Sequence, residues 1–194
     1  LLDRPLGIDV ELASLVMEAP DTEWRLEEAT SLRVQGSMLS TDGLRLLGSP
    51  DPASPAGSRP AIAARGVVDL QGVSDFALSV ESVGLDRVGR VTQSDVLPGG
   101  LLDLEVNVRG PAEAPEIDGE FRVSNLEMGE QRLSSLEGVF DYQGQELEAR
   151  VTGADGGGEL IRIEGQFPID LSFREVEDRF LDGEMDFLVS VDSL

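Results

Sequence analysis

Apolar and polar residues alternate with a period of two along most of the chain. In residues 102–108 and again in residues 167–173, every second residue is Leu, Val, Ile or Phe. The same alternation occurs at 8–12, 76–80, 121–123, 136–142, 147–151, 161–163 and 187–191. Successive side chains of a β-strand point to opposite faces, so this period predicts strands with one apolar and one polar face.

Glycine and proline fall between these apolar runs, as expected for turns that separate short strands. The glycines that suggest turns are Gly36, Gly43, Gly66, Gly72, Gly99, Gly100, Gly119, Gly144 and the triplet at 156–158. Residues 48–60 are rich in Pro and Ser, which predicts a loop. Residues 21–30 have too few apolar residues for a helical stripe, so we expect a strand around Trp24 and Leu26 followed by an acidic turn. Residues 174–179 are expected to form a loop. The sequence thus predicts an all-β fold.

The sequence also contains an internal repeat. Residues 75–82 and 186–193 are identical at five of eight positions, and the two segments lie 111 residues apart. We interpret this as two incomplete copies of a unit of about 100 residues, the kind of unit that stacks on its neighbours because it cannot bury its apolar face alone. The predicted organisation is a first repeat at 1–98 and a second at 99–194, which includes the start of the next. Both ends lie inside strand-like patterns, which indicates an excerpt of a longer protein.

The apolar face poses an energetic problem. About fifteen to twenty apolar side chains point the same way, and burial of each is worth roughly 1.5–3 kcal/mol. That sum is several times the net stability of a domain, so the face must be covered. A sandwich or barrel would give a dry core, whereas a U-shaped sheet would give an apolar groove that something else fills. A lining of aliphatic side chains suits acyl chains, and it equally suits a sandwich core.

Charge and composition exclude several functions. The chain has 38 acidic residues against 15 basic ones, all of them arginine, and a net charge of −23. Such a chain repels nucleic acids and anionic bilayers. It has no cysteine and no histidine, which removes thiolate metal sites and the usual general base. No apolar run reaches the ~20 residues of a membrane-spanning helix.

The carboxylates suggest two kinds of site, and we favour neither. The acid–base candidates are Glu116 with Asp118, and Glu175, Glu177 and Asp178. They are close in sequence and lie on turns or polar faces, which favours a solvated acidic surface over catalysis. Residues 41–43 and 153–159 place oxygen ligands beside glycine, but without the spacing of a calcium loop. Trp24 and Tyr142 are interpreted as core or rim residues. We therefore expect no enzyme, no metal and no cofactor.

Residues 101–128, LLDLEVNVRGPAEAPEIDGEFRVSNLEM, carry a family resemblance. A strand ends at Gly110-Pro111, Pro115 follows, and Ile117-Asp118-Gly119 opens the next strand. Residues 134–153 are similar to the hairpin that follows in the family, residues 156–173 to the strand that closes the unit, and residues 5–38 to earlier strands. The chain resembles the C-terminal region of the TamB-like proteins, components of the translocation and assembly module within the AsmA-like superfamily.

The resemblance implies a repetitive antiparallel sheet curled into a U-shaped β-taco, or repeating β-groove. It implies a periplasmic segment of an inner-membrane-anchored protein of a Gram-negative-type bacterium, which conducts phospholipid between the two membranes or supports outer-membrane protein assembly. Partners would be phospholipid acyl chains and, through the parent protein, an outer-membrane barrel assembly partner. The membrane would be contacted only through the parent protein's ends, and nucleic acid is not expected. The alternative is a β-sandwich or β-solenoid binding or adhesive module of a surface protein, with a dry core.

The residues expected to line the lipid groove share an aliphatic or phenyl side chain and a place on the apolar face. They are Leu104, Val106, Val108, Phe121, Val123, Phe140, Ile161, Ile163, Phe167, Ile169, Leu171, Val189 and Val191.

Overall fold

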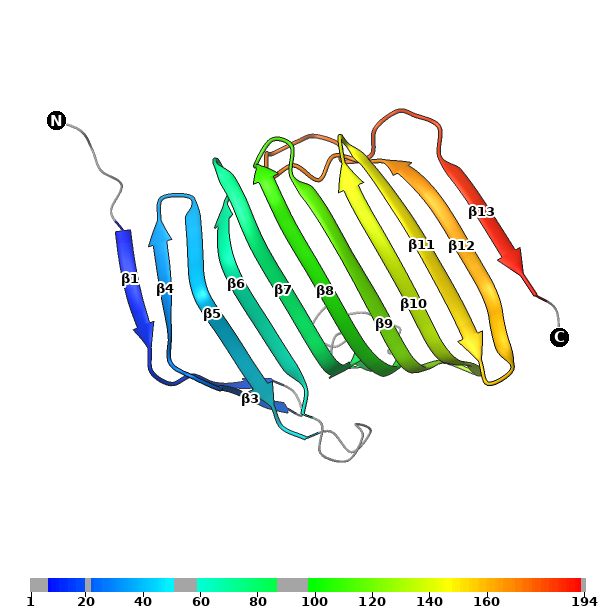
Figure 1. The fold of residues 1–194 in the computed structure, drawn as a ribbon, viewed down its shortest axis with the longest axis horizontal. Helices are drawn as coiled ribbons and strands as arrows, with labels where there is room; N and C mark the ends of the chain where they lie inside the picture. The colour runs from blue at the N-terminus through cyan, green and yellow to red at the C-terminus, as the bar shows by residue number, and fades with distance from the viewer. Residues whose placement is uncertain (1–6, 20–21, 51–58, 87–97, 193–194) are drawn as a thin grey trace.

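The chain forms one large antiparallel β-sheet (Figure 1). The computed structural model describes residues 7–19, 22–50, 59–86 and 98–192, and 13 strands of these residues belong to the sheet. The first seven strands are β1 (Gly7–Leu12), β2 (Val16–Ala19), β3 (Thr22–Leu26), β4 (Thr30–Gln35), β5 (Met38–Gly48), β6 (Ala61–Asp69) and β7 (Val73–Gly84). The others are β8 (Gly99–Pro111), β9 (Glu116–Met128), β10 (Gln131–Gln143), β11 (Glu146–Asp155), β12 (Gly158–Pro168) and β13 (Asp186–Val191).

The strands follow one another across the sheet nearly in chain order. The hydrogen-bonded order is β1-β4-β5-β6-β7-β8-β9-β10-β11-β12-β13, and β3 pairs with β2 and with the end of β5. The sheet does not close into a barrel: Figure 1 shows β1 and β13 at its two ends. The all-β fold that the alternation predicts is therefore present, and so is the repetitive antiparallel sheet that the resemblance implies. The repeat boundary expected at Pro98 falls between β7 and β8, which pair directly.

The two copies of the sequence repeat occupy corresponding positions in the sheet. Phe76 on β7 lies opposite Gly66 on β6, and Phe187 on β13 lies opposite Gly165 on β12. The two similar segments thus share one local arrangement, in which a phenylalanine faces a glycine on the neighbouring antiparallel strand.

Three of the glycines predicted to form turns lie inside strands instead. Gly43 is in β5, Gly66 in β6 and Gly119 in β9, while Gly99 and Gly100 begin β8. At Gly119 a Cβ atom would lie 2.5 Å from Cζ of Phe140 and 2.6 Å from the main-chain oxygen of Glu105. The glycine is needed there because the Phe140 ring lies against the backbone, and no turn is involved.

The strand predicted across residues 167–173 stops after its second residue. β12 ends at Pro168, and the chain leaves the sheet because the N–H of Asp170 donates to the main-chain oxygen of Arg179 at 2.8 Å. The strand around Trp24, the turn after it and the loop at 174–179 are confirmed. Residues 51–58 of the predicted Pro-rich loop lie outside the described residues.

One cluster of buried side chains lies toward the β3 end of the sheet, and further buried apolar side chains, Leu101, Val123 and Leu126, lie on β8 and β9. Trp24 from β3 packs with Leu46 of β5 and Val83 of β7, and half-buried neighbours from β5, β6 and β7 surround them. The β2–β3 hairpin therefore covers only one corner of the apolar face.

Candidate functional site: the apolar face

Apolar side chains on neighbouring strands line up in rows across the sheet. One row runs from Ile62 on β6 through Val80, Leu104, Phe121, Gly138, Val151 and Ile163 to Val189 on β13. The adjacent row is Ala64, Leu78, Val106, Gly119, Phe140, Ala149, Gly165 and Phe187. Because side chains directly opposite each other share a face, these rows form a face without a charged residue over eight strands. We call it the apolar face.

Eleven of the thirteen predicted groove residues lie on this face. Those in the two central rows are Leu104, Val106, Phe121, Phe140, Ile163 and Val189, and those in the flanking rows are Val108, Val123, Ile161, Phe167 and Val191. Val123 is buried, and the remainder on β8 to β12 are half-buried. Val189 and Val191 are more than half exposed, because β13 has a strand on one side only.

The other two predicted residues, Ile169 and Leu171, lie beyond the sheet. They belong to a segment that leaves β12, folds back on itself and leads to β13, which we call the finger (residues 169–181). Ile169 pairs with Phe180 by an isolated bridge, and the N–H of Leu181 donates to the main-chain oxygen of Pro168 at 3.1 Å. Pro168, the last residue of β12, marked this end of the strand in the sequence, since proline favours strand ends.

Strand glycines are the part of the apolar face that sequence reasoning missed. A Cβ atom at Gly138 would lie 2.3 Å from Cε1 of Phe121, so the ring rests directly on the glycine backbone. At Gly165 a Cβ would lie 3.2 Å from ring atoms of both Phe167 and Phe187, whose centroids are 4.8 Å apart in an edge-to-face arrangement. The signal was available, because the period-two alternation continues through these glycines.

The finger crosses the apolar face at one end of the strands. Tyr142 belongs to the row of Ile117, Leu147 and Phe167, and its hydroxyl accepts a hydrogen bond from the N–H of Leu171 at 2.9 Å. Tyr142 is only 2% exposed. At the β8–β9 turn the main-chain oxygen of Ala112 accepts from the N–H of Phe173 at 2.8 Å. Tyr142 is thus a buried anchor, in agreement with its interpretation as a core or rim residue.

Asp170 and Arg179 hold the finger together from within. Nη1 of Arg179 donates to the main-chain oxygens of Asp170 at 3.0 Å and Ser172 at 2.5 Å, and Nη2 donates to that of Arg174 at 3.0 Å. The Asp170 carboxylate accepts from the N–H of Ser172 at 2.8 Å. Hydrogen bonding from Ser172, together with the charge of Arg179, holds the pKa of Asp170 below its usual value.

The opposite face of the sheet carries the charges. Cross-strand ion pairs join Arg122 to Glu137 at 2.5 Å and Arg150 to Glu164 at 2.8 Å. Many carboxylates face one another instead: Asp141 lies opposite Asp118 on one side and Glu148 on the other. Such pairs repel weakly in water, so this polar face is a solvated acidic surface.

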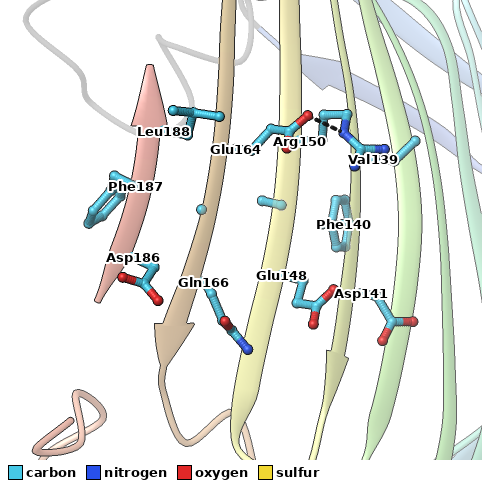
Figure 2. A pocket seen from close by; sticks show the side chains of 12 residues that line it. Val139, Phe140, Asp141, Glu148, Arg150, Glu164, Gln166, Asp186, Phe187 and Leu188 are labelled. Carbon is cyan, nitrogen blue, oxygen red and sulfur yellow. Dashed lines mark hydrogen bonds and ion pairs between the residues drawn. The ribbon is translucent and has the colours of Figure 1, made fainter. Parts of the chain in front are cut away.

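A hollow of about 610 Å³ lies between β10 and β13 and is lined mainly by the polar face (Figure 2). Its side chains on that face are Val139, Asp141, Glu148, Arg150, Glu164, Gln166, Asp186 and Leu188. Strand alternation places Phe140 and Phe187, also shown, on the apolar face. Arg150 is paired with Glu164, so the hollow contains carboxylates without a free cation from its own lining to activate them.

The acid–base and calcium candidates are spread over separate local contacts. Glu116 accepts from the side-chain amide of Gln143, and Asp118 accepts from that of Asn107. Asp178 and Asp155 each accept an N–H two residues ahead, as turn-forming aspartates do. In the described ranges, no three His, Cys, Asp or Glu side chains are grouped to hold a metal ion.

Comparison of the chain with models of protein families, with curated proteins and with solved structures gave no match. Within the part of the chain that the structure describes, no helix is long and apolar enough to cross a membrane.

Proposed function

We propose that the apolar face shields phospholipid acyl chains in an aqueous compartment. The observation that carries this proposal is the continuity of the apolar rows from β6 to β12, combined with the half-buried state of most of their side chains. The described strands form a single sheet, in which the β2–β3 hairpin covers one corner of these rows; the finger covers one end, and no second sheet of the described residues packs on them. Acyl chains fit such a face because they need no hydrogen bonds from it.

The family resemblance supplies the proposed setting. A TamB-like segment would lie in the periplasm, between an inner-membrane anchor and an outer-membrane barrel assembly partner, and would move phospholipid along the rows or support outer-membrane protein assembly. The acidic face supports this proposal because it would keep an uncovered sheet soluble and separate from its neighbours. The alternative, a dry-core binding module, requires a second apolar layer from another segment or chain.

A photo-crosslinking amino acid at Val106 tests the proposal. Val106 lies in a central row, and its neighbour Glu105 points to the polar face, which makes Glu105 the matched control. We expect a crosslinker at Val106 to capture phospholipid from vesicles or cells, and one at Glu105 to capture none. Capture of protein alone at Val106 would favour the dry-core alternative and contradict the lipid proposal.

Substitution at the same two positions tests transport. Val106→Asp places a charge among apolar side chains, where desolvation of the carboxylate is costly, so lipid transfer between vesicles should fall strongly. Glu105→Ser should leave transfer unchanged. Far-UV circular dichroism of both variants checks that the sheet still forms.

A further inference from the structure

We propose that the finger is a hinged side cover, which opens to admit acyl chains to the apolar face at one end of strands β8–β11. This inference rests on the proposed function for the identity of the cargo. The opening itself depends only on the contacts of the finger.

The finger is joined to the sheet firmly at its base and sparsely elsewhere. At the base the chain is continuous with β12, and the N–H of Ile169 donates to the main-chain oxygen of Gln145 at 2.9 Å. At the far end one backbone hydrogen bond, from Phe173 to Ala112, is accompanied by an ion pair of Arg174 with Glu113 at 2.5 Å. That ion pair is exposed, so it contributes little to holding the finger down.

The finger also satisfies most of its own polar groups. Arg179 donates to three of its main-chain oxygens, and Asp170 and Arg179 pair through the backbone. A segment with internal hydrogen bonds can move as a unit without leaving its polar groups unpaired. Opening would break the hydrogen bonds to the Tyr142 hydroxyl and the Ala112 oxygen and the ion pair with the Glu113 carboxylate, which water can replace. It would also expose the buried Tyr142 ring, and this loss of burial is the larger part of what holds the finger closed.

Opening would uncover the edge of the apolar face. Tyr142 and Ala112 are 2% and 3% exposed, and Ala112 also joins two turns, since its N–H donates to the main-chain oxygen of Gly72 at 2.8 Å. The row of Ile117, Tyr142, Leu147 and Phe167 lies next to this edge. With the finger open, an acyl chain that enters here would contact apolar side chains directly. With the finger closed, the main chain of Leu171 occupies this place beside the Tyr142 hydroxyl.

Chemical crosslinking of the far end tests the hinge. The chain has no cysteine, so Glu113→Cys with Arg174→Cys gives two exposed thiols at positions whose side chains now meet. A short bis-maleimide would then fix the finger closed. The matched control is Arg122→Cys with Glu137→Cys, which crosslinks two strands on the polar face.

The first measurement is the rate at which a pyrene-labelled phospholipid moves from phosphatidylcholine vesicles to the protein. We expect the 113–174 crosslink to slow loading at least tenfold and the 122–137 crosslink to leave it within twofold. Tyr142→Phe, which removes the hydroxyl acceptor, should speed loading. Equal loading rates with and without the 113–174 crosslink would overturn the hinge while leaving the proposed lipid function intact.

The second measurement is amide hydrogen exchange without lipid. We expect the amides of Leu171 and Phe173 to exchange at least a hundredfold faster than those of Leu104 and Val106, and the 113–174 crosslink to remove most of that difference. Finger amides as protected as the sheet would overturn the hinge. If no lipid loads onto any form, the proposed function fails, and exchange still decides whether the finger opens.

Discussion

Gly138→Ala tests whether the Phe121 ring depends on a glycine backbone beneath it. The added Cβ would lie 2.3 Å from Cε1 and 2.5 Å from Cζ of Phe121, and its three nearest atoms all belong to that ring. These distances are too short, so the ring must leave its place on the sheet. Overpacking of this kind destabilises the folded state by about 1–3 kcal/mol. Replacing glycine also makes the unfolded chain less flexible, which stabilises the protein by about 0.4–1 kcal/mol.

The net expectation is a loss of about 1–2 kcal/mol, or a fall in Tm of roughly 2–8 °C for a chain of this size. Thermal unfolding followed by far-UV circular dichroism measures it. Gly43→Ala is the control, because a Cβ there meets nothing within 4 Å and Gly43 has no positive φ; its Tm should stay level or rise slightly.

A second substitution shows whether the loss of stability comes from the clash with Phe121 or from alanine at position 138 itself. Leucine at position 121 has no ring over Gly138, so Gly138→Ala should cost much less in the Phe121→Leu background. We expect a coupling energy of about 1 kcal/mol between the two sites. Additive losses, or a Gly138→Ala variant as stable as the parent, would refute the ring-on-glycine explanation.

Three further changes test the electrostatics and the finger. The Ser37 hydroxyl and the N–H of Gln71 hold the pKa of Asp69 low. The stability that the Asp69 carboxylate contributes is therefore present above about pH 4 and is lost as pH falls through the lowered pKa. When stability is measured against pH in acid, the Asp69→Asn variant should lose stability less steeply than the parent, and equal slopes for the two proteins would contradict this. Asp141→Asn relieves the repulsion of Asp118 and Glu148 and should stabilise the sheet by about 0.2–1 kcal/mol in low salt, with less effect in high salt. Tyr142→Phe should speed amide exchange in the finger while Tm changes by only a few degrees; a general loss of protection would show that Tyr142 supports the whole sheet.

The strand content and the shared face of eleven groove residues could be predicted because both depend on local alternation. A period of two fixes which side chains share a face, whatever the sheet does at longer range. Gly119 was misread as a turn because glycine alone does not show whether it ends a strand or makes room for a ring. Only the register, which places Phe140 opposite, distinguishes the two.

The finger could not be predicted from the same pattern. Residues 167–173 alternate as a strand does, and Ile169 and Leu171 fit the groove by periodicity alone. Their departure from the sheet depends on Arg179, ten residues after Ile169, whose guanidinium binds three main-chain oxygens. Local alternation carries no information about such a contact, although Pro168 indicates where the strand must stop.

The apolar face and the finger differ in how a lipid would meet them. Under the proposed function, an acyl chain along the rows would gain only by desolvation, so one aliphatic residue could replace another, and only a charge such as Val106→Asp would interrupt the path. At the finger, the cover depends on directional hydrogen bonds to two particular groups, the Tyr142 hydroxyl and the Ala112 oxygen. If the finger opens as proposed, loss of either bond should change how often the face opens without changing its affinity for acyl chains. Conservative substitutions along the rows should therefore leave transfer nearly unchanged, while single changes at the finger alter its rate.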